Sequence, residues 1–291
     1  MMLVTGATGN IGRVLLDALA SRGEGTTGGL RGLTRDVGRA AFPAGVEAVE
    51  GDLAEAASLG PALAGVHSMF LPSRVGADEE VLDAARRAGV EHVVLVSSVT
   101  VQTHPHLGPA RENLAVEKLL KGSGMAWTIL RPTQYASNTL WWAPAILAGE
   151  PVRVPYADTG LPTIHPGDIS AVAQAALTDP EHRGRTYALT GPVRVTPREQ
   201  VEAIAKALGR QVPFAEIDRG QAHRDMAALF GAEGADAVLD LMGGDVNDEL
   251  LAVRDTVERI TGSQARTFEQ WAAEHAPAFG GPRFDSSGGG L

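Results

Sequence analysis

Short apolar runs alternate with amphipathic stretches along the first half of the chain. Residues 2–4 form an apolar run, and residues 11–19 carry apolar side chains at helical spacing after a break that contains glycine. This pattern predicts a strand, a turn and a helix. The same unit recurs, with strands expected at residues 46–49, 67–71, 92–96 and 127–130 and helices at 55–63 and 78–88.

The alternation also predicts how the strands are arranged. Residues 92–96 are a nearly continuous apolar run, which is typical of a central parallel strand covered on both faces. Parallel strands require crossover connections, and these are right-handed helices. We therefore expect an α/β fold with a doubly wound parallel sheet. Its second strand is assigned to residues 25–33 by position alone, because the many glycines there weaken a strand.

The pattern changes after residue 132, where several prolines interrupt short segments and no strand and helix unit fits. A helix at 168–177 and a strand at 186–189 are expected to return to the sheet. Residues 196–208, which begin with a Thr-Pro-Arg-Glu capping box, and most of 219–275 are expected to form helices of a smaller lobe. The expected domains are 1–131 with 166–191 for the sheet, 132–165 with 192–279 for a mainly helical lobe, and 280–291 as a disordered tail rich in glycine and serine.

Composition and charge narrow the classes of function. The chain has 291 residues, of which 44% are hydrophobic, so it can bury a sizeable core. With 35 acidic and 25 basic residues the formal net charge is -10, which would repel a phosphate backbone and argues against nucleic-acid binding. The absence of cysteine excludes disulfides, thiolate metal sites and cysteine nucleophiles.

No targeting or membrane segment is expected. The first residues run directly into a folded-looking strand without a signal-peptide pattern. The longest apolar-looking stretch, residues 140–148, contains Pro144 and is far shorter than the roughly 20 residues that a membrane helix needs. We therefore expect a soluble cytoplasmic protein without a membrane or nucleic-acid partner, either a monomer or a homodimer.

Three glycines between the first strand and the first helix carry the strongest chemical signal. Gly6 would allow a tight turn, Gly9 would let the backbone approach a pyrophosphate, and Gly12 would let the helix pack close to the sheet. The alternative is an ordinary glycine-rich turn, but the flanking strand and helix favour dinucleotide binding. The expected cofactor-binding residues of this turn are Gly6, Thr8, Gly9, Asn10, Ile11 and Gly12.

Two later positions bear on which dinucleotide is bound. Arg35 follows the presumed second strand, where the adenosine ribose would lie, and Thr34 stands where an acidic residue would mark NAD. A cation there favours the 2′-phosphate of NADPH, although Asp36 beside it opposes that attraction and Arg35 could be a solvated surface charge. Asp52 could meet the adenine amino group, cap the segment that begins at Ala54, or do both. We expect NADPH, with NADH as the alternative.

Taken together, seven segments resemble a known family. They are GATGNIG at residues 6–12, TRD at 34–36, GDL at 51–53, VSS at 96–98, VEKL at 116–119, ILRP at 129–132 and LTGP at 189–192. The chain resembles the NmrA-like atypical short-chain dehydrogenases over roughly residues 1–275, and among them the type 2 NAD(P)H:quinone oxidoreductases. The resemblance implies a Rossmann fold with a small helical lobe over the nicotinamide. It also implies adenine contacts at Asp52 and Leu53, a further cofactor contact at Leu71, and Ser97 beside the nicotinamide.

The usual catalytic pair of short-chain dehydrogenases is missing. Those enzymes use a tyrosine and a lysine four residues later, and the lysine lowers the phenol pKa so that it donates a proton to a carbonyl. The family register places Pro109 at the tyrosine position and Asn113 at the lysine position. A quinone accepts hydride readily and needs mainly orientation against the cofactor, so the departure favours quinone reduction. The rival interpretation is a non-catalytic NADP sensor that binds a protein partner.

The resemblance also points to residues on the acceptor side. Tyr135 and Asn138 match a tyrosine and an asparagine that the quinone reductases place beside the nicotinamide. Tyr135 is therefore the candidate catalytic residue, orienting the acceptor or donating a proton. Alternatively, Tyr135 packs in the seam between lobes with its hydroxyl satisfied. Trp141 is a candidate for lining an aromatic substrate pocket. Alternatively, Trp141 and the adjacent Trp142 pack in a core or an interface.

Two further residues bear on the site. His104 lies in the loop beyond the strand that precedes Ser97, which is where substrates bind in open α/β sheets. It is a candidate substrate contact and proton donor, and the plainer alternative is a surface histidine, as for His106. No spacing indicates a metal site. Asp168 matches a family position at which the acid caps a helix, so a structural role is expected.

These expectations define one function and one alternative. The chain is expected to be an NAD(P)H-dependent oxidoreductase that transfers hydride to a quinone or a related conjugated carbonyl compound, with an aromatic or quinonoid small molecule as its partner. The alternative is the non-catalytic sensor of the NmrA type.

Overall fold

The computed structural model describes residues 1–23, 29–74 and 76–282. The chain divides into two compact units. Unit 1 comprises Met1–Pro132, Pro166–Leu189 and Thr256–Ser263, and unit 2 comprises Thr133–His165, Thr190–Asp255 and the described part of Gln264–Leu291. Each unit is described separately below.

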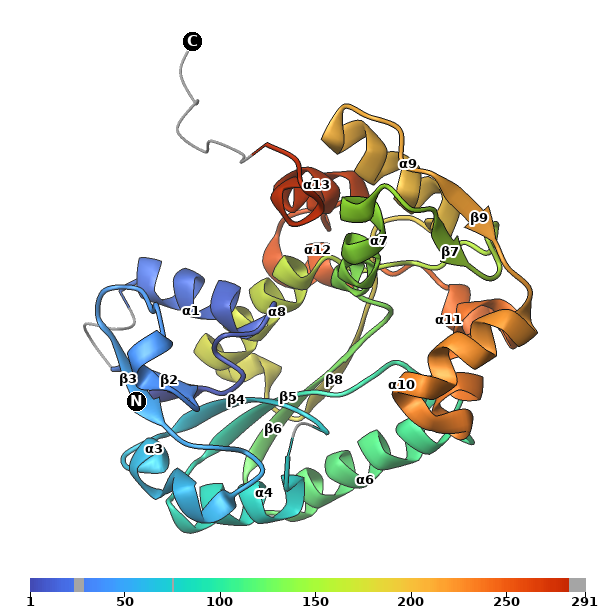
Figure 1. Ribbon diagram of the computed structural model, residues 1–291. Helices are drawn as coiled ribbons and strands as arrows, with labels where there is room; N and C mark the ends of the chain where they lie inside the picture. Colours follow the sequence, from blue (N-terminus) through green and yellow to red (C-terminus); the bar gives the residue numbers. More distant parts are fainter. Residues whose placement is uncertain (24–28, 75, 283–291) are drawn as a thin grey trace. The chain divides into compact units, whose positions relative to one another are not determined.

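Unit 1 is built on a seven-stranded sheet in the order β3-β2-β1-β4-β5-β6-β8, in which every neighbouring pair is parallel (Figure 1). The strand order reverses between β1 and β4, which is the mark of a doubly wound sheet. The strands are β1 (Met2–Val4), β2 (Leu30–Thr34), β3 (Val46–Glu50), β4 (Ser68–Pro72), β5 (His92–Val96), β6 (Ala126–Pro132) and β8 (Arg185–Leu189). The expected fold class is therefore confirmed.

Helices cover both faces of this sheet. Helices α1 (Gly12–Ser21) and α8 (Pro166–Thr178) lie on one face, and α3 (Gly60–Leu63), α4 (Asp78–Arg87) and α6 (Gly108–Gly122) lie on the other (Figure 1). Apolar residues of β4 and β5 pack against α4 and α6 in the main core cluster. Helix α4 has three acidic residues in its first turn and two arginines in its last, which complements the helix dipole.

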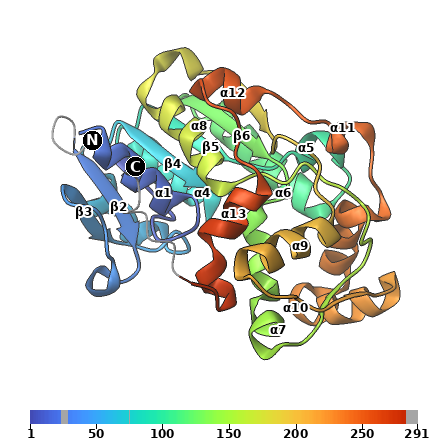
Figure 2. The same cartoon turned by 90° about the horizontal axis from the view of Figure 1, so that it is seen from above.

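Helix α12 (Thr256–Thr261) belongs to unit 1, although residues 192–279 were expected in the smaller lobe. It packs against α8 and β8, and Figure 2 shows α12 beside α8 on the same face of the sheet. Val257 is buried in this helix. The helix is short and mostly polar, so its sequence does not indicate that it packs in unit 1. Short elements complete the unit: η1 (Val37–Arg39), η2 (Ala56–Leu59), α5 (Thr100–Thr103) and η4 (Pro180–His182).

Unit 2 is mainly helical and has its own apolar core, centred on Trp271, Phe268 and Phe279. Its elements are η3 (Ala136–Trp142), α7 (Ala143–Ala148), β7 (Val152–Val154), α9 (Pro197–Leu208), β9 (Phe214–Glu216), α10 (Arg219–Leu239), η5 (Asp240–Gly244), α11 (Asp248–Leu251), α13 (Phe268–Glu274) and η6 (Ala276–Phe279). Strands β7 and β9 pair in parallel as a separate two-stranded sheet, which the sequence did not predict. No described helix combines the length and the apolar character needed to cross a membrane.

Several element boundaries differ from expectation. The helix expected at 55–63 is split into η2 and α3, because Gly60 and Pro61 interrupt the hydrogen-bond ladder. Strand β2 begins at Leu30, so it covers only the end of the expected 25–33, and residues 25–28 lie outside the described part of the chain. Most of the expected tail, residues 283–291, also lies outside it.

A buried histidine lies at the start of β5. His92 Nε2 lies 3.0 Å from Thr128 Oγ1, and the Thr128 hydroxyl donates its one proton to the carbonyl of His182 at 2.9 Å. His92 Nε2 must therefore carry the proton in its hydrogen bond to Thr128. Burial, together with the charge of Arg183, lowers the pKa of His92 from 6.5 to about 4.

We expect stability to fall as the pH drops from 6.5 towards 4. Because the folded pKa of His92 is below the unfolded one, the unfolded chain binds more protons in this window, and the full loss is about 3 kcal/mol. His92→Gln keeps a donor for Thr128 but cannot titrate. Urea unfolding at a series of pH values should therefore give a shallower slope for the variant. Parallel curves for parent and variant would contradict this assignment.

Candidate functional site

The glycine turn between β1 and α1 closes tightly on itself. Gly6 has φ +59°, in the left-handed region that favours glycine, and its carbonyl accepts a hydrogen bond from the amide of Gly9 at 2.9 Å. A Cβ at Gly12 would lie 2.3 Å from the same carbonyl oxygen, and a Cβ at Gly9 would lie 3.2 Å from it. Gly12 therefore lets the start of α1 pack closely on the turn itself.

The start of α1 is tied to a second helix. The hydroxyl of Ser170, in α8, donates to the carbonyl of Ile11 at 2.9 Å. Thr8, Gly9 and Asn10 are exposed, whereas Ile11 is half-buried and Gly12 is buried. The turn is therefore exposed where the pyrophosphate contact is expected, and its Gly9 amide already donates to the Gly6 carbonyl.

A cavity of about 320 Å³ lies over the carboxyl ends of the first four strands of the sheet. Its lining residues are Gly6, Thr8, Gly9, Leu33, Thr34, Arg35, Gly51, Asp52, Leu53 and Pro72. The carboxyl edge of an open parallel sheet, where the strand order reverses, is the place where such folds bind dinucleotides. The glycines of the turn have no side chains to fill this cavity, and the strands end in polar residues. Such a cavity fits the adenosine half of a dinucleotide.

Arg35 is exposed at the end of β2, and it also lines a neighbouring cavity of about 340 Å³. It forms no ion pair with the described residues, whereas Asp36 pairs with Arg39 at 3.3 Å. The Asp36 carboxylate is thus paired with Arg39 rather than with Arg35. The Arg35 guanidinium is exposed to a ligand anion. Thr34 Oγ1 accepts from the amide of Asp36 at 3.2 Å, which shapes the turn after the strand.

We expect Arg35→Ala to weaken NADPH binding by roughly ten- to a hundredfold, because a charge-assisted contact to the 2′-phosphate contributes about 1.5–3 kcal/mol. NADH, which lacks that phosphate, should lose far less affinity. Arg39→Ala is the matched control, since Arg39 is already paired with Asp36. Titration calorimetry with both cofactors measures the difference, and equal losses would place Arg35 outside the ribose site.

Asp52 and Leu53 line the cavity, while Leu71 does not. Asp52 Oδ1 accepts from the amide of Ala54 at 2.9 Å, so this carboxylate stabilises a turn as well as facing the cavity. The side chain of Leu71 is fully buried in the core, and the cofactor contact expected at this position stays a prediction. Side chains alternate along a strand, and the next residue, Pro72, lines the cavity instead.

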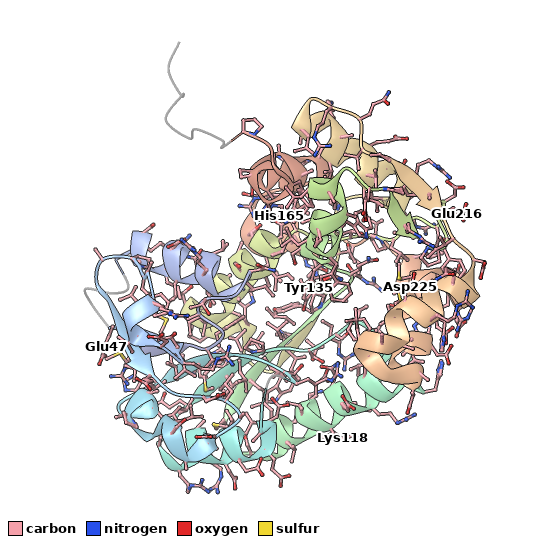
Figure 3. The ribbon with its side chains drawn as sticks, viewed as in Figure 1. Glu47, Lys118, Tyr135, His165, Glu216 and Asp225 are labelled. Carbon is pink, nitrogen blue, oxygen red and sulfur yellow. The ribbon has the colours of Figure 1, made fainter. Side chains whose placement is uncertain are left out.

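The residues at the two positions of the missing catalytic pair, Pro109 and Asn113, are hydrogen-bonded to each other, and Asn113 is also bonded to Ser73. Asn113 is buried in α6, its Nδ2 donates to the Pro109 carbonyl at 2.9 Å, and its Oδ1 lies 2.5 Å from Ser73 Oγ. Lys118 lies on the exposed face of the same helix (Figure 3), so it does not replace the absent lysine. Ser97, at the end of β5, is buried and donates to Glu117 Oε1 at 2.7 Å.

The acceptor-side candidates Tyr135, Asn138 and Trp141 belong to unit 2. Tyr135 precedes η3 (Figure 3), forms a parallel bridge with Ile164, and has its pKa raised to about 12 by burial. Asn138 is half-buried in η3. Trp141 is 63% exposed and lies 5.4 Å from the ring of Phe230, so the core alternative is wrong for this tryptophan.

The remaining candidates have structural surroundings. His104 is fully buried at the end of α5, with Nδ1 2.8 Å from Thr103 Oγ1, so the surface-histidine interpretation is wrong for it. A direct substrate contact by His104 would need a rearrangement, because its side chain has no exposed surface. His106 is exposed. Asp168 is buried in the first turn of α8, where a carboxylate stabilises the helix start.

Comparison with known proteins places this chain in a family. Residues 6–180 match the model of a family described as NAD(P)H-binding. A (4-alkanoyl-5-oxo-2,5-dihydrofuran-3-yl)methyl phosphate reductase from Streptomyces griseus is 38% identical and covers 96% of this chain and 99% of its own. An NAD(P)H azoreductase from Xenophilus azovorans is 34% identical, with 96% and 99% covered. The crystal structure of an NADPH-dependent quinone oxidoreductase from Escherichia coli matches with a TM-score of 0.76 at 25% identity, covering 94% and 99%.

These relatives are named reductases, which confirms that the chain is an oxidoreductase rather than only a sensor. They also confirm the resemblance to quinone oxidoreductases and the expectation of an NAD(P)H cofactor. The glycine turn and its cavity lie within the matched residues. The chain therefore belongs to the family described as NAD(P)H-binding.

Proposed function

We propose that the chain reduces a quinone or another electron-poor conjugated compound with NADPH. The observation that supports this most directly is the environment of Asn113, whose amide donates to the Pro109 carbonyl and accepts from the Ser73 hydroxyl. Without the tyrosine and lysine pair, α6 offers no acid to protonate an ordinary ketone. An acceptor that is already electron-poor needs mainly to be held against the hydride donor.

In this proposal, separate groups of residues bind the cofactor and the acceptor. The glycine turn binds the pyrophosphate, Asp52 and Leu53 bind the adenosine, and Arg35 binds the 2′-phosphate. NADPH supplies the hydride. Tyr135 and Asn138 contact the acceptor, and the exposed ring of Trp141 contacts its aromatic part.

The names of the relatives support the same acceptor class. The relative from Streptomyces griseus is named for a 5-oxo-2,5-dihydrofuran, a ring in which a carbon–carbon double bond is conjugated to a lactone carbonyl. The others are named for azo and quinone acceptors. Each of these groups is electron-poor and conjugated, as the proposed acceptor class requires.

A panel of acceptors tests the proposal. Oxidation of NADPH should be fast with quinones, azo dyes or conjugated lactones and slow with unconjugated ketones and aldehydes of similar size. Gly9→Val, which removes the cofactor site, is the control for background oxidation. Preferential reduction of unconjugated ketones would contradict the proposal.

Restoring the family lysine should bring little gain. Asn113→Lys replaces the buried amide, but Pro109 provides no phenol for the lysine to activate. We expect the rate with the best acceptor of the panel to stay equal or to fall, measured as steady-state turnover at saturating NADPH. A clear increase would show that acid catalysis limits the parent.

A further inference from the structure

The three acceptor-side candidates share one face of η3. A 3₁₀ helix has about three residues per turn, so side chains three residues apart lie above one another. Tyr135, Asn138 and Trp141 have this spacing. The amide of Asn138 donates to the carbonyl of Tyr135 at 3.0 Å, which is the hydrogen bond of a 3₁₀ turn. The three side chains therefore form a row along η3.

This row becomes more exposed along its length. Tyr135 and Asn138 are half-buried, whereas Trp141 is exposed. Ala136 and Thr139, on another side of the helix, are buried, so the row is the open side of η3. With a rise of about 2.0 Å per residue, Trp141 lies about 12 Å along the helix from Tyr135.

A second aromatic ring meets the exposed end of the row. The ring of Phe230, in α10, lies 5.4 Å from the ring of Trp141. Phe230 is 39% exposed, and the preceding Leu229 is 75% exposed. Single exposed apolar side chains are common on protein surfaces, but several at one place mark a binding surface. Trp141, Leu229 and Phe230 are called the apolar end of the row below.

Helix α10 folds back on itself directly after these two residues. Arg219 and Asp236 are 17 residues apart, which would separate them by about 25 Å in a straight helix. Arg219 Nη2 nevertheless donates to Asp236 Oδ1 at 3.0 Å. Gly231 has φ +74° and ψ 168°, a conformation that breaks the helix and favours glycine. Residues 219–230 and 232–239 are therefore two arms of a helical hairpin.

Specific contacts hold this hairpin together. Arg219 Nη1 lies 2.9 Å from Asp240 Oδ1 and donates to the Tyr156 hydroxyl at 3.1 Å. A Cβ at Gly234 would lie 2.9 Å from the Cβ of Phe230, so a glycine lets the second arm approach the turn closely. The backbone that presents Phe230 to solvent is thus fixed before a ligand binds. A preorganised surface of this kind binds at a low cost in conformational entropy.

We propose that the acceptor carries an elongated apolar substituent and that Trp141, Leu229 and Phe230 bind it. The inference rests on the proposed function, in which Tyr135 contacts the conjugated group of the acceptor. With that group at Tyr135, the substituent follows the row along η3 and reaches the apolar end after about 12 Å. Two aromatic rings and a leucine then remove the substituent from water.

The substituent is remote from the reacting atoms, so it binds equally well in the ground state and in the transition state. Binding of that kind changes KM and leaves kcat unchanged. A fully buried methylene changes affinity about fourfold and a partly buried one less, so KM should fall about twofold for each methylene added. The gain should end once the substituent is longer than about 12 Å, where the row ends.

A series of 1,4-benzoquinones with alkyl substituents from methyl to tetradecyl tests this expectation. KM and kcat are measured for each quinone at saturating NADPH. A KM that falls with chain length and then levels off, at constant kcat, is the expected result. A KM that does not depend on chain length would overturn the proposal.

Two substitutions at the turn of α10 connect the chain-length effect to this surface. Phe230→Ala and Leu229→Ser should each raise KM for the decyl quinone about tenfold, the lower range for burial of a large apolar side chain. Neither should change KM for the methyl quinone or kcat for either compound. Leu119→Ser, at an exposed leucine of α6 in unit 1, is the matched control. A chain-length effect that persists in both turn variants would overturn the assignment to Leu229 and Phe230.

Titration calorimetry with NADP⁺ separates this inference from the proposed function. The oxidised cofactor has no hydride to transfer, so the Kd of each quinone is measured without turnover. A Kd that depends on chain length and on Phe230, without turnover in the presence of NADPH, would contradict the proposed function and support the apolar site. Rapid turnover with a Kd independent of chain length would do the opposite.

A second copy of the chain is the other occupant that this surface could have. Sedimentation of the parent and of Phe230→Ala over a range of concentrations measures this directly. We expect the same oligomeric state for both proteins. A parent dimer that dissociates in Phe230→Ala would assign the apolar end to an interface between copies and would overturn the proposal.

Discussion

Gly9→Val should abolish NADPH binding that calorimetry can detect, while the protein stays folded. Gly9 is exposed where the turn lines the cavity, so a valine side chain would occupy the space of the pyrophosphate. Its Cβ would lie 3.2 Å from the Gly6 carbonyl oxygen, which requires the turn to give by only a few tenths of an ångström. Normal affinity in a folded variant would remove the glycine turn from the cofactor site.

Gly12→Ala is the informative comparison for the same turn. A Cβ at this position would lie 2.3 Å from the Gly6 carbonyl oxygen and 2.8 Å from its carbon, and both are backbone atoms that cannot rotate away. We expect this smaller substitution to lower the free energy of unfolding by about 1–3 kcal/mol, the usual cost of overpacking. In thermal unfolding, Gly12→Ala should therefore be less stable than Gly9→Val, although valine adds more volume than alanine.

Elements that are specified locally were predictable from the sequence. Strand β5 was predicted at its observed bounds because it is a continuous apolar run, buried on both faces. Helix α9 begins where expected because Thr196 and Glu199 form the capping box reciprocally. The positions of the glycine turn, Arg35 and Asp52 could be predicted for the same reason, since each follows the end of a strand.

Features that depend on distant partners were not predictable. Strands β7 and β9 are each three residues long, and their pairing joins segments about 60 residues apart, so no local pattern marks them. Whether Leu71 or Pro72 lines the cavity depends on a one-residue register, which places alternate side chains on opposite faces. The burial of Glu117 was hidden because a glutamate beside an exposed lysine on a helix is usually solvated.

The environment of Tyr135 bears on its role in the reaction. The sequence leaves two roles possible for Tyr135: its ring orients the acceptor, or its phenol donates a proton. Burial raises the pKa of Tyr135 to about 12, so its hydroxyl stays protonated at neutral pH and gives up its proton less readily than an ordinary tyrosine. General acids work best when their pKa is near the working pH. The raised pKa favours an orienting ring over a proton-donating hydroxyl, and two substitutions separate these roles.

Tyr135→Phe should consequently keep kcat/KM within about threefold of the parent, because it removes only the hydroxyl. Tyr135→Ala should lower kcat/KM with the best quinone by about 10²-fold, since the acceptor loses the surface that aligns it with the cofactor and small misplacements cost that much. NADPH affinity should be unchanged in both variants, and Tyr187→Phe, on β8 of unit 1, is the control for removing a phenol elsewhere. A loss of about 10²-fold in Tyr135→Phe would instead identify the phenol as the proton donor. Parent-like turnover in both variants would make Tyr135 a packing residue and move the acceptor contact elsewhere in the chain.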